Sequence, residues 1–208
     1  MENEYFAKDF QIADVTIQVA EEWNKFCEQG KEILVSRGYI RSSNGGIKYL
    51  VEPLIRNFTK FTSNGGWIAS EDEEGWAVLA MEAFSHFSYH YSGGQLMVSD
   101  LQGRCFYDRY NVNRCRFELS DPAICSRTRR YGPTDLGEKG IDSFFCNHNC
   151  NQFCQLHWIC PSSPQQWFPR TRGTSMVSSR MTSQLALTSR TTFRLATMEE
   201  SDSDSDYD

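Results

Sequence analysis

Three side chains of the types that bind zinc are closely spaced in the second half of the chain. His148, Cys150 and Cys154 form the pattern H-x-C-x3-C, and zinc takes imidazole nitrogens and thiolates into closed tetrahedral sites. One helix cannot carry all three, because His148 would lie about 200° around it from Cys150, whereas the two cysteines are only about 40° apart. We therefore expect a break near Asn149, with His148 in the preceding turn and the two thiolates on the first turns of a short helix.

A closed zinc site needs a fourth ligand from elsewhere in the chain. By residue type and position, the candidates are His86, His90, Cys146 and His157. The competing interpretation is that these cysteines are small, buried, apolar residues of a reduced protein. Three donors at this spacing favour the metal site.

The overall charge excludes some classes of function. The 208 residues carry a formal net charge of -6. Six acidic residues near the C-terminus account for all of it: Glu199, Glu200, Asp202, Asp204, Asp206 and Asp208. The remainder is close to neutral, which argues against a nucleic-acid-binding surface.

The N-terminus is too polar for a signal peptide, and no apolar run reaches the roughly 18 residues that a membrane span needs. We therefore expect no membrane association and a cytoplasmic location, where the 8 cysteines stay reduced.

Hydrophobic spacing predicts a mixture of helices and strands. Apolar residues recur every three or four positions over 5–29 and over 73–91, which predicts two amphipathic helices. Residues 32–36 and 47–55 have strand character and are joined through a glycine-containing turn, which favours a hairpin. Residues 95–101 predict a strand that runs into a turn at Gln102 and Gly103.

Two further stretches are polar. Residues 104–118 are rich in arginine and tyrosine, which predicts a surface loop. After residue 160 the composition shifts to Pro, Ser, Thr and Arg and then to an acidic end, which predicts a disordered tail over 161–208. The folded domain is therefore expected to span residues 1–160.

Several motifs occur together in a fixed order. AFSHFSYHYSGGQLMVSDLQG is followed by LSDPAI and then by YGPTDLGEKGIDSFFCNHNCNQFC, and VEPLI and SNGGW precede them. In this order the motifs resemble the catalytic core of the alpha-kinase family, a group of atypical serine/threonine protein kinases. The resemblance covers roughly residues 5–156. It implies an α+β, atypical protein-kinase-like fold with a zinc-stabilised C-lobe.

The resemblance also assigns roles to residues. It implies that Asp100 is the catalytic aspartate, that Gln102 lies beside it at the phosphates, and that Asp121 binds Mg²⁺. Phosphoryl transfer needs such carboxylates, because it depends on positioning and charge neutralisation. Glu52 matches a position at the adenine end of the ATP cleft.

The family's zinc site has two histidines and two cysteines, and its matching positions are His86, His148, Cys150 and Cys154. The resemblance thus selects His86 as the fourth ligand. Such a site would be structural. Gly132, Gly137 and Gly140 correspond to a glycine-rich segment that contacts the protein substrate in the family.

Two departures from the family pattern stand out. The family's ATP-binding lysine lies on an N-lobe strand before the first helix, and Lys8, Lys25, Lys31 and Lys48 do not match it, so we expect a truncated N-lobe. The connection over 104–118 is longer than in the family, and its arginines could block the cleft or bind phosphate.

The sequence thus supports two functions. The first is a kinase that transfers the γ-phosphate of Mg-ATP to a serine or threonine of a protein substrate. The alternative is a zinc-stabilised pseudokinase or regulatory binding module, favoured by the missing lysine. No motif indicates a particular oligomeric state.

Overall fold

The structure is a computed structural model that describes residues 6–27, 31–70, 75–107 and 115–177. Its helices are α2 (Ala7–Phe26), α4 (Trp76–Tyr91) and α5 (Glu138–Phe145). Its strands are β1 (Lys31–Val35), β2 (Tyr39–Ser42), β3 (Lys48–Val51), β4 (Thr59–Lys60), β5 (Leu96–Ser99), β6 (Gln102–Tyr107), β7 (Cys115–Leu119) and β8 (Ala123–Ser126). The mixture agrees with the predicted α+β class.

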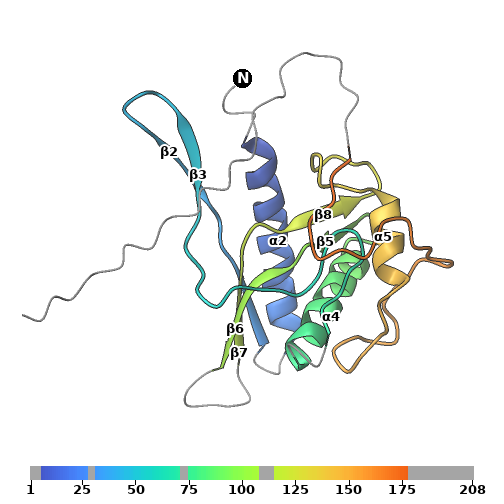
Figure 1. Cartoon of the computed structure of the whole chain (residues 1–208). Helices are drawn as coiled ribbons and strands as arrows, with labels where there is room; N and C mark the ends of the chain where they lie inside the picture. The colour runs from blue at the N-terminus through green and yellow to red at the C-terminus, as the bar shows by residue number, and fades with distance from the viewer. Residues whose placement is uncertain (1–5, 28–30, 71–74, 108–114, 178–208) are drawn as a thin grey trace, which may run out of the picture. The chain divides into compact units, whose positions relative to one another are not determined.

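The strands form three separate sheets (Figure 1). The largest has the order β1-β7-β6-β4, in which β1 runs parallel to β7 and the other neighbours are antiparallel. The hairpin β2–β3 and the antiparallel ribbon β5–β8 are the other two. The ribbon also places two aspartates, Asp100 and Asp121, at one of its ends.

The predicted hairpin between 32–36 and 47–55 is wrong in its pairing. Strand β3 pairs with β2, so that Ile40 lies opposite Leu50. Strand β1 joins the large sheet instead, where Ile33 lies opposite Phe117 and both are fully buried. The glycine-containing turn is present, but it joins β2 to β3. Strand β1 pairs with β7 because this buries Ile33 in the core.

The predicted surface loop over 104–118 is also wrong. Its described parts form β6 and β7, and residues 108–114 lie outside the described residues. Cys115, Phe117 and Leu119 are buried on one face of β7, so this strand alternates as a half-buried strand should. A Cβ on Gly103 would lie 1.9 Å from the Glu118 carbonyl oxygen, so only glycine allows the two strands to approach this closely.

The two described arginines of this stretch, Arg104 and Arg116, pair with carboxylates of the same sheet. Arg104 Nε lies 2.9 Å from Glu118 Oε2, and Arg116 Nε lies 2.8 Å from Glu32 Oε2. Neither described arginine is therefore placed to block a cleft.

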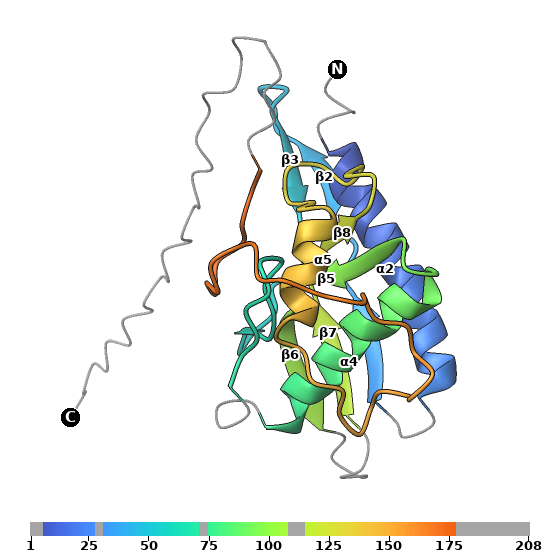
Figure 2. The ribbon, with the colours of Figure 1, turned by 90° about the vertical axis from the view of Figure 1, so that its right-hand side faces the viewer.

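Both predicted long helices are present and share one core. Trp23 of α2 makes edge-on contacts with Phe84 and Phe87 of α4, at centroid distances of 5.7 and 5.5 Å. Trp158, beyond the cysteine pattern, packs against Trp23 and is only 6% exposed. Helix α4 also packs along β5, and α5 lies beside β8 (Figures 1 and 2).

Residues 161–177 depart from the predicted disorder. They have no helix or strand, but they run alongside α5 in both ribbon views (Figures 1 and 2). Phe168 and Val177 pack against a core cluster that includes Phe144 and Met97. The polar composition suggested disorder, whereas a few aromatic and backbone contacts order this part. Residues 178–208 lie outside the described residues.

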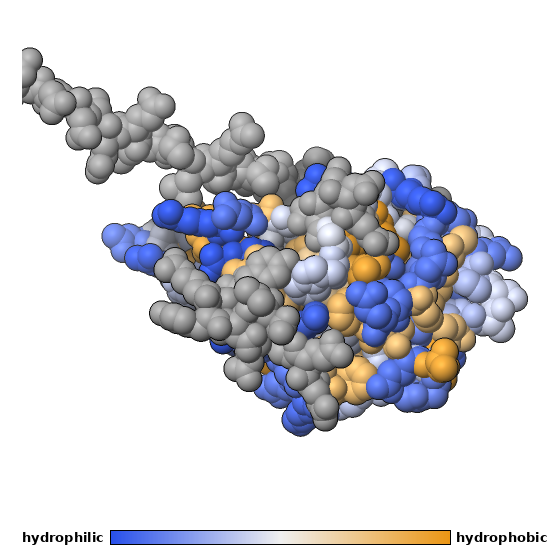
Figure 3. All heavy atoms as spheres, turned by 90° about the horizontal axis from the view of Figure 1, so that it is seen from below, coloured by the Kyte–Doolittle hydropathy of each residue, from blue (hydrophilic) through white to orange (hydrophobic). Residues whose placement is uncertain are grey.

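Apolar and hydrophilic side chains are interspersed on the face seen in Figure 3. Among the described helices, none combines the length and apolar character needed to cross a bilayer.

Candidate active site and metal centre

The ribbon β5–β8 places two aspartates at the same end. Ser99 of β5 pairs with Ala123 of β8. Asp100 directly follows β5, and Asp121 lies two residues before β8. Beyond this pair the two segments stay in contact, because the Ser120 N–H donates to the Gln102 carbonyl at 3.1 Å. The structure thus brings together Asp100, Gln102 and Asp121, which the resemblance assigned to one reaction centre.

Both aspartates have a left-handed backbone conformation. The φ angle is 58° at Asp100 and 48° at Asp121. Non-glycine residues adopt this region infrequently, and such strain is concentrated at functional sites. The conformation turns the chain sharply at each strand end.

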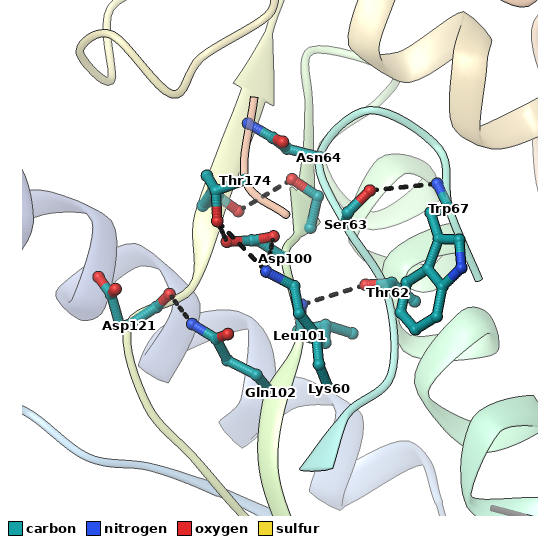
Figure 4. Close-up of polar contacts among 12 residues, drawn as sticks. Lys60, Thr62, Ser63, Asn64, Trp67, Asp100, Leu101, Gln102, Asp121 and Thr174 are labelled. Atoms are coloured by element: carbon teal, nitrogen blue, oxygen red, sulfur yellow. Dashed lines mark hydrogen bonds and ion pairs between the residues drawn. The ribbon is translucent and has the colours of Figure 1, made fainter. Parts of the chain in front are cut away.

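The Asp100 carboxylate is buried in an ion pair with Lys60 of β4 (Figure 4). Lys60 Nζ lies 2.8 Å from Asp100 Oδ1, and the two side chains are 12% and 3% exposed. Thr174 Oγ1 donates a hydrogen bond to the other oxygen, Asp100 Oδ2, at 2.6 Å. The carboxylate is therefore held on one side and meets a hydroxyl group on the other.

Sequence reasoning missed Lys60. The residue lies 40 positions before Asp100, in a two-residue strand with no motif of its own. The available signal was its place just before Thr62 and the SNGGW motif. That loop contacts the Asp100 turn directly, because the Leu101 N–H donates to Thr62 Oγ1 at 3.1 Å.

Asp121 is exposed, in contrast to Asp100. Gln102 Nε2 donates to the Asp121 carbonyl oxygen at 3.1 Å, which ties the two segments together without using the Asp121 carboxylate (Figure 4). An exposed carboxylate is the type of ligand that a hard cation such as Mg²⁺ takes, because Mg²⁺ prefers oxygen ligands and keeps several waters.

Glu52 lies next to the end of the β5–β8 ribbon that bears the two aspartates. Ser120 Oγ, from the residue before Asp121, donates to Glu52 Oε2 at 3.1 Å. Partial burial of the carboxyl raises the pKa of Glu52, the Ser120 hydrogen bond opposes that rise, and the charge of Asp9 adds to it. The structure therefore joins Glu52 to the segment that carries Asp121, through Ser120.

The three glycines of the predicted substrate loop have different surroundings. A Cβ on Gly140 would lie 2.5 Å from Cys125 Sγ, and one on Gly137 would lie 2.5 Å from Arg129 Nε. Around Gly132 a Cβ would meet only Lys8, at 3.8 Å. Close packing thus explains why glycine is needed at Gly137 and Gly140, whereas the surroundings of Gly132 are more open.

Asp135 holds this loop in place. It is fully buried and accepts hydrogen bonds from the N–H groups of Ser126, Tyr131 and Gly137, and from Ser126 Oγ. Ser126 belongs to β8, so the loop is attached to the same ribbon as the two aspartates. Sequence reasoning did not identify this role.

The four predicted zinc ligands converge on one point. One donor atom from each of His86, His148, Cys150 and Cys154 lies within 4.8 Å of the other three. Of the other candidates, His90 packs against Trp158 and His157, and Cys146 is exposed. The described residues therefore place His86 of α4 beside the cysteine pattern.

Three of the six distances between these donors match the edges of a zinc tetrahedron, and all six lie within 4.8 Å. Usual zinc bond lengths would separate two nitrogens by about 3.3 Å, and a nitrogen from a sulfur by about 3.6 Å. His86 Nδ1 lies 3.2 Å from His148 Nε2 and 3.7 Å from Cys150 Sγ. Cys154 Sγ lies 3.6 Å from His148 Nε2. The residues thus fit a zinc ion.

Hydrogen bonds on the far side of each imidazole reinforce this fit. His86 Nε2 lies 3.1 Å from the Ile159 carbonyl, and His148 Nδ1 lies 2.9 Å from Glu82 Oε2. With protons on these outer nitrogens, the two facing nitrogens present lone pairs. Cys160 Sγ also lies 3.3 Å from His86 Nε2. Two lone pairs at 3.2 Å would repel each other unless a cation lay between them.

Burial affects the protonation of the donors. It lowers the pKa of His86 to about 4, and the nearby His148 adds to this, so the ring is neutral near pH 7. Burial raises the pKa of the Cys154 thiol to about 12. A bound cation would reverse the shift of the thiol, since coordination favours the thiolate.

The predicted short helix after Asn149 is wrong. Residues 148–155 contain no helix and turn at 152–153, where the Cys154 N–H donates to the Asn151 carbonyl and the Phe153 N–H to Asn151 Oδ1, both at 2.9 Å. The Asn151 side chain competes with a helical backbone for these groups. The predicted break between His148 and the thiolates agrees with the turns.

Comparison with curated proteins finds relatives that match between about half and two thirds of this chain. Eukaryotic elongation factor 2 kinase of Caenorhabditis elegans is 32% identical over 151 residues, which cover 68% of this chain and 18% of that protein. Alpha-protein kinase vwkA of Dictyostelium discoideum is 38% identical over 100 residues, covering 47% of this chain and 14% of that protein. The chain therefore spans less than a fifth of the length of these relatives.

Solved structures show the same fold. The alpha-kinase domain of myosin-II heavy chain kinase A in complex with AMP-PNP superposes with a TM-score of 0.58 at 28% identity. The match covers 73% of this chain and 55% of that one. The profile of the alpha-kinase family matches residues 1–154. With most of its length matched by that profile, the chain belongs to the alpha-kinase family.

Proposed function

We propose that this chain phosphorylates serine or threonine residues of a protein substrate with Mg-ATP. One observation carries the proposal. The buried Asp100 carboxylate is fixed by Lys60 in a strained turn, at the ribbon end that also bears the exposed Asp121. A buried ion pair in a strained turn, next to an exposed carboxylate, is not needed merely to stabilise the fold.

In the proposed reaction, Asp100 accepts the proton of the substrate hydroxyl. A general base must lie within about 2.6–3.2 Å of the proton's parent atom, and Asp100 Oδ2 already meets a hydroxyl at 2.6 Å. Lys60 keeps the Asp100 carboxylate oriented and compensates its charge in the buried position.

Asp121 and Gln102 are proposed to work at the phosphates. Asp121 offers an exposed carboxylate for Mg²⁺, and Gln102 holds the Asp121 backbone through its carbonyl. When bound, Mg²⁺ neutralises charge on the phosphates. Glu52 is proposed to contact the adenine end, and its link through Ser120 ties that end to Asp121.

The remaining assignments follow the family. We propose that the loop with Gly132, Gly137 and Gly140 contacts the protein substrate, with Gly132 having the most open surroundings. His86, His148, Cys150 and Cys154 would hold a structural zinc ion that links α4 to the segment after α5. We propose residues 1–160 as the kinase domain and a cytoplasmic location.

A pseudokinase is the second candidate. The observation that favours it is the buried ion pair in which Lys60 is engaged by Asp100. In this alternative the zinc centre and the loop would serve binding without phosphoryl transfer.

The test is transfer of ³²P from Mg-[γ-³²P]ATP to casein and to myelin basic protein by the zinc-loaded chain. We expect Asp100→Asn to lower the rate by about 100- to 10,000-fold while the protein stays folded. Asp14→Asn is a matched control, because Asp14 pairs with Arg37 on the exposed surface. Failure of the unchanged, folded chain to label either acceptor would favour the pseudokinase.

A further inference from the structure

Part of this chain already occupies the space in front of Asp100. Thr174 Oγ1 donates to Asp100 Oδ2 at 2.6 Å and accepts from Lys60 Nζ at 3.2 Å (Figure 4). The hydroxyl thus lies between the proposed base and the cation that fixes it. A phosphoacceptor needs this relation to the base.

Backbone contacts hold the segment on either side of that hydroxyl. The Ser175 N–H donates to Asn64 Oδ1 and the Ser175 carbonyl accepts from Asn64 Nδ2, both at 2.8 Å. Two residues later, the Val177 N–H donates to the Pro133 carbonyl at 2.9 Å. These contacts use only the main chain of the segment, which is how extended peptides are commonly bound.

Asn64 also connects the bound segment to the loop that contains Gly132, Gly137 and Gly140. The side chain is fully buried, and its Nδ2 also donates to the Thr134 carbonyl at 2.8 Å. Both Thr134 and Pro133 belong to the loop proposed to contact the protein substrate. The segment therefore touches the loop and the base together, as a substrate peptide would.

Anchors upstream bring the segment to this position. The Trp167 N–H donates to Ser143 Oγ of α5 at 3.0 Å, and Phe168 packs against the neighbouring apolar cluster. The Arg172 guanidinium lies 5.7 Å from the Trp67 ring centroid, within range of a cation–π contact. The family profile ends at residue 154, so these contacts belong to a part of this chain beyond the matched region.

We propose that residues 169–177 are a substrate bound in cis and that Thr174 is phosphorylated by the active site of its own chain. The inference rests on the proposed kinase function. In the reaction, a bond forms between Thr174 Oγ1 and the γ-phosphorus of ATP, and the bond from that phosphorus to the β,γ-bridging oxygen breaks. The hydroxyl proton passes to Asp100 Oδ2, and ADP leaves with the electron pair.

The reaction has a consequence for access to the site. Phosphothreonine carries a charge of about −1.5 to −2 at pH 7. Beside the Asp100 carboxylate this charge is repelled, which favours release of the segment. The unphosphorylated segment therefore competes with other substrates, and phosphorylation removes the competition.

Ser175 provides a neighbouring hydroxyl for comparison. Its Oγ lies 3.2 Å from where a Cβ on Gly65 would be, and only its backbone is bonded to Asn64. The geometry thus selects Thr174 over the next residue.

The experiment incubates the full, zinc-loaded chain with Mg-[γ-³²P]ATP at chain concentrations spanning a hundredfold range, with casein present in a parallel series. Phosphorylated positions are located by mass spectrometry. We expect label on Thr174 with a first-order rate that does not change with chain concentration. Thr174→Ser should keep label at this position and Ser175→Ala should keep label on Thr174, whereas Thr174→Val and Asp100→Asn should remove it.

Three results would overturn the inference and are distinguishable from one another. Labelled casein with unlabelled Thr174 would leave the kinase function intact and reject the cis substrate. A rate per chain that rises in proportion to concentration would show transfer between chains. Absence of label on both Thr174 and casein would reject the kinase function as well.

Discussion

The candidate metal centre and the ribbon end that bears Asp100 and Asp121, here called the carboxylate edge, differ in how openly they present their side chains. At the metal centre, donors from α4 and from the turns after α5 face one another, and their outer atoms are bonded to Glu82 and Ile159. At the edge, one carboxylate is buried against Lys60 and the other, on Asp121, is exposed. A closed set of donors stabilises a fold, whereas strained backbone at an exposed carboxylate is typical of functional sites.

The largest expected effect tests the closed side of this comparison. Cys154→Ser should remove zinc binding, worth on the order of 10 kcal/mol in apparent free energy, and with it the cooperative unfolding of the domain. Metal analysis and thermal unfolding followed by circular dichroism would measure both. We expect about one zinc ion per unmodified chain.

Cys146→Ser is the matched control for this change. Cys146 is exposed and lies outside the cluster, so its replacement should alter stability by no more than about 0.5 kcal/mol. Equal zinc content and equal melting temperatures in the Cys154→Ser and Cys146→Ser variants would contradict the assignment of Cys154 as a zinc ligand.

The second effect concerns the buried ion pair at the open side. Lys60→Met leaves the Asp100 carboxylate buried without its cation, which should lower the free energy of unfolding by about 3–5 kcal/mol. Urea unfolding measures it. Adding Asp100→Asn to Lys60→Met should restore much of the loss, because the double variant no longer buries an unpaired charge. Additive losses would mean that the two side chains do not interact.

A smaller effect tests whether the stability of the large sheet depends on the close approach of β6 to β7. Gly103→Ala should cost about 1–3 kcal/mol, because its Cβ would collide with the Glu118 carbonyl oxygen. Gly173→Ala is the comparison, since a Cβ there meets no atom within 4 Å. Equal urea midpoints for the two variants would show that β6 and β7 can move apart without a loss of stability.

The smallest effect is expected at the exposed ion pairs. Arg116→Ala breaks the contact with Glu32, and the two side chains are 50% and 46% exposed. Such pairs contribute about 0–1 kcal/mol, so the urea midpoint and the rate of phosphoryl transfer should hardly change. A loss as large as that of Lys60→Met would contradict the distinction between buried and exposed charge pairs.

The sequence was most informative where the signal was local. The helical stripes of α2 and α4, and the ligand spacing around His148, follow from periodicity and residue type within short windows. The resemblance then selected His86 among the open candidates, and the geometry places it in the cluster.

Long-range pairing was not accessible in the same way. The partner of β1 is β7, about 80 residues away, and no local pattern indicates a parallel partner. The alternation of Cys115, Phe117 and Leu119 was present in the sequence, but the surrounding arginines and tyrosines suggested a loop. Lys60 and Thr174 meet Asp100 only through the tertiary fold, so composition alone predicted disorder for the segment that carries Thr174.

One paired measurement tests the central claim most directly. Zinc content and ³²P transfer to casein should be measured on the same samples of the unchanged chain and of Asp100→Asn. The account predicts about one zinc ion per chain in both proteins, and transfer by the unchanged chain alone. Equal transfer by the two zinc-loaded proteins would contradict the assignment of Asp100 as the base and, with it, the division between a metal centre that stabilises and a carboxylate edge that acts.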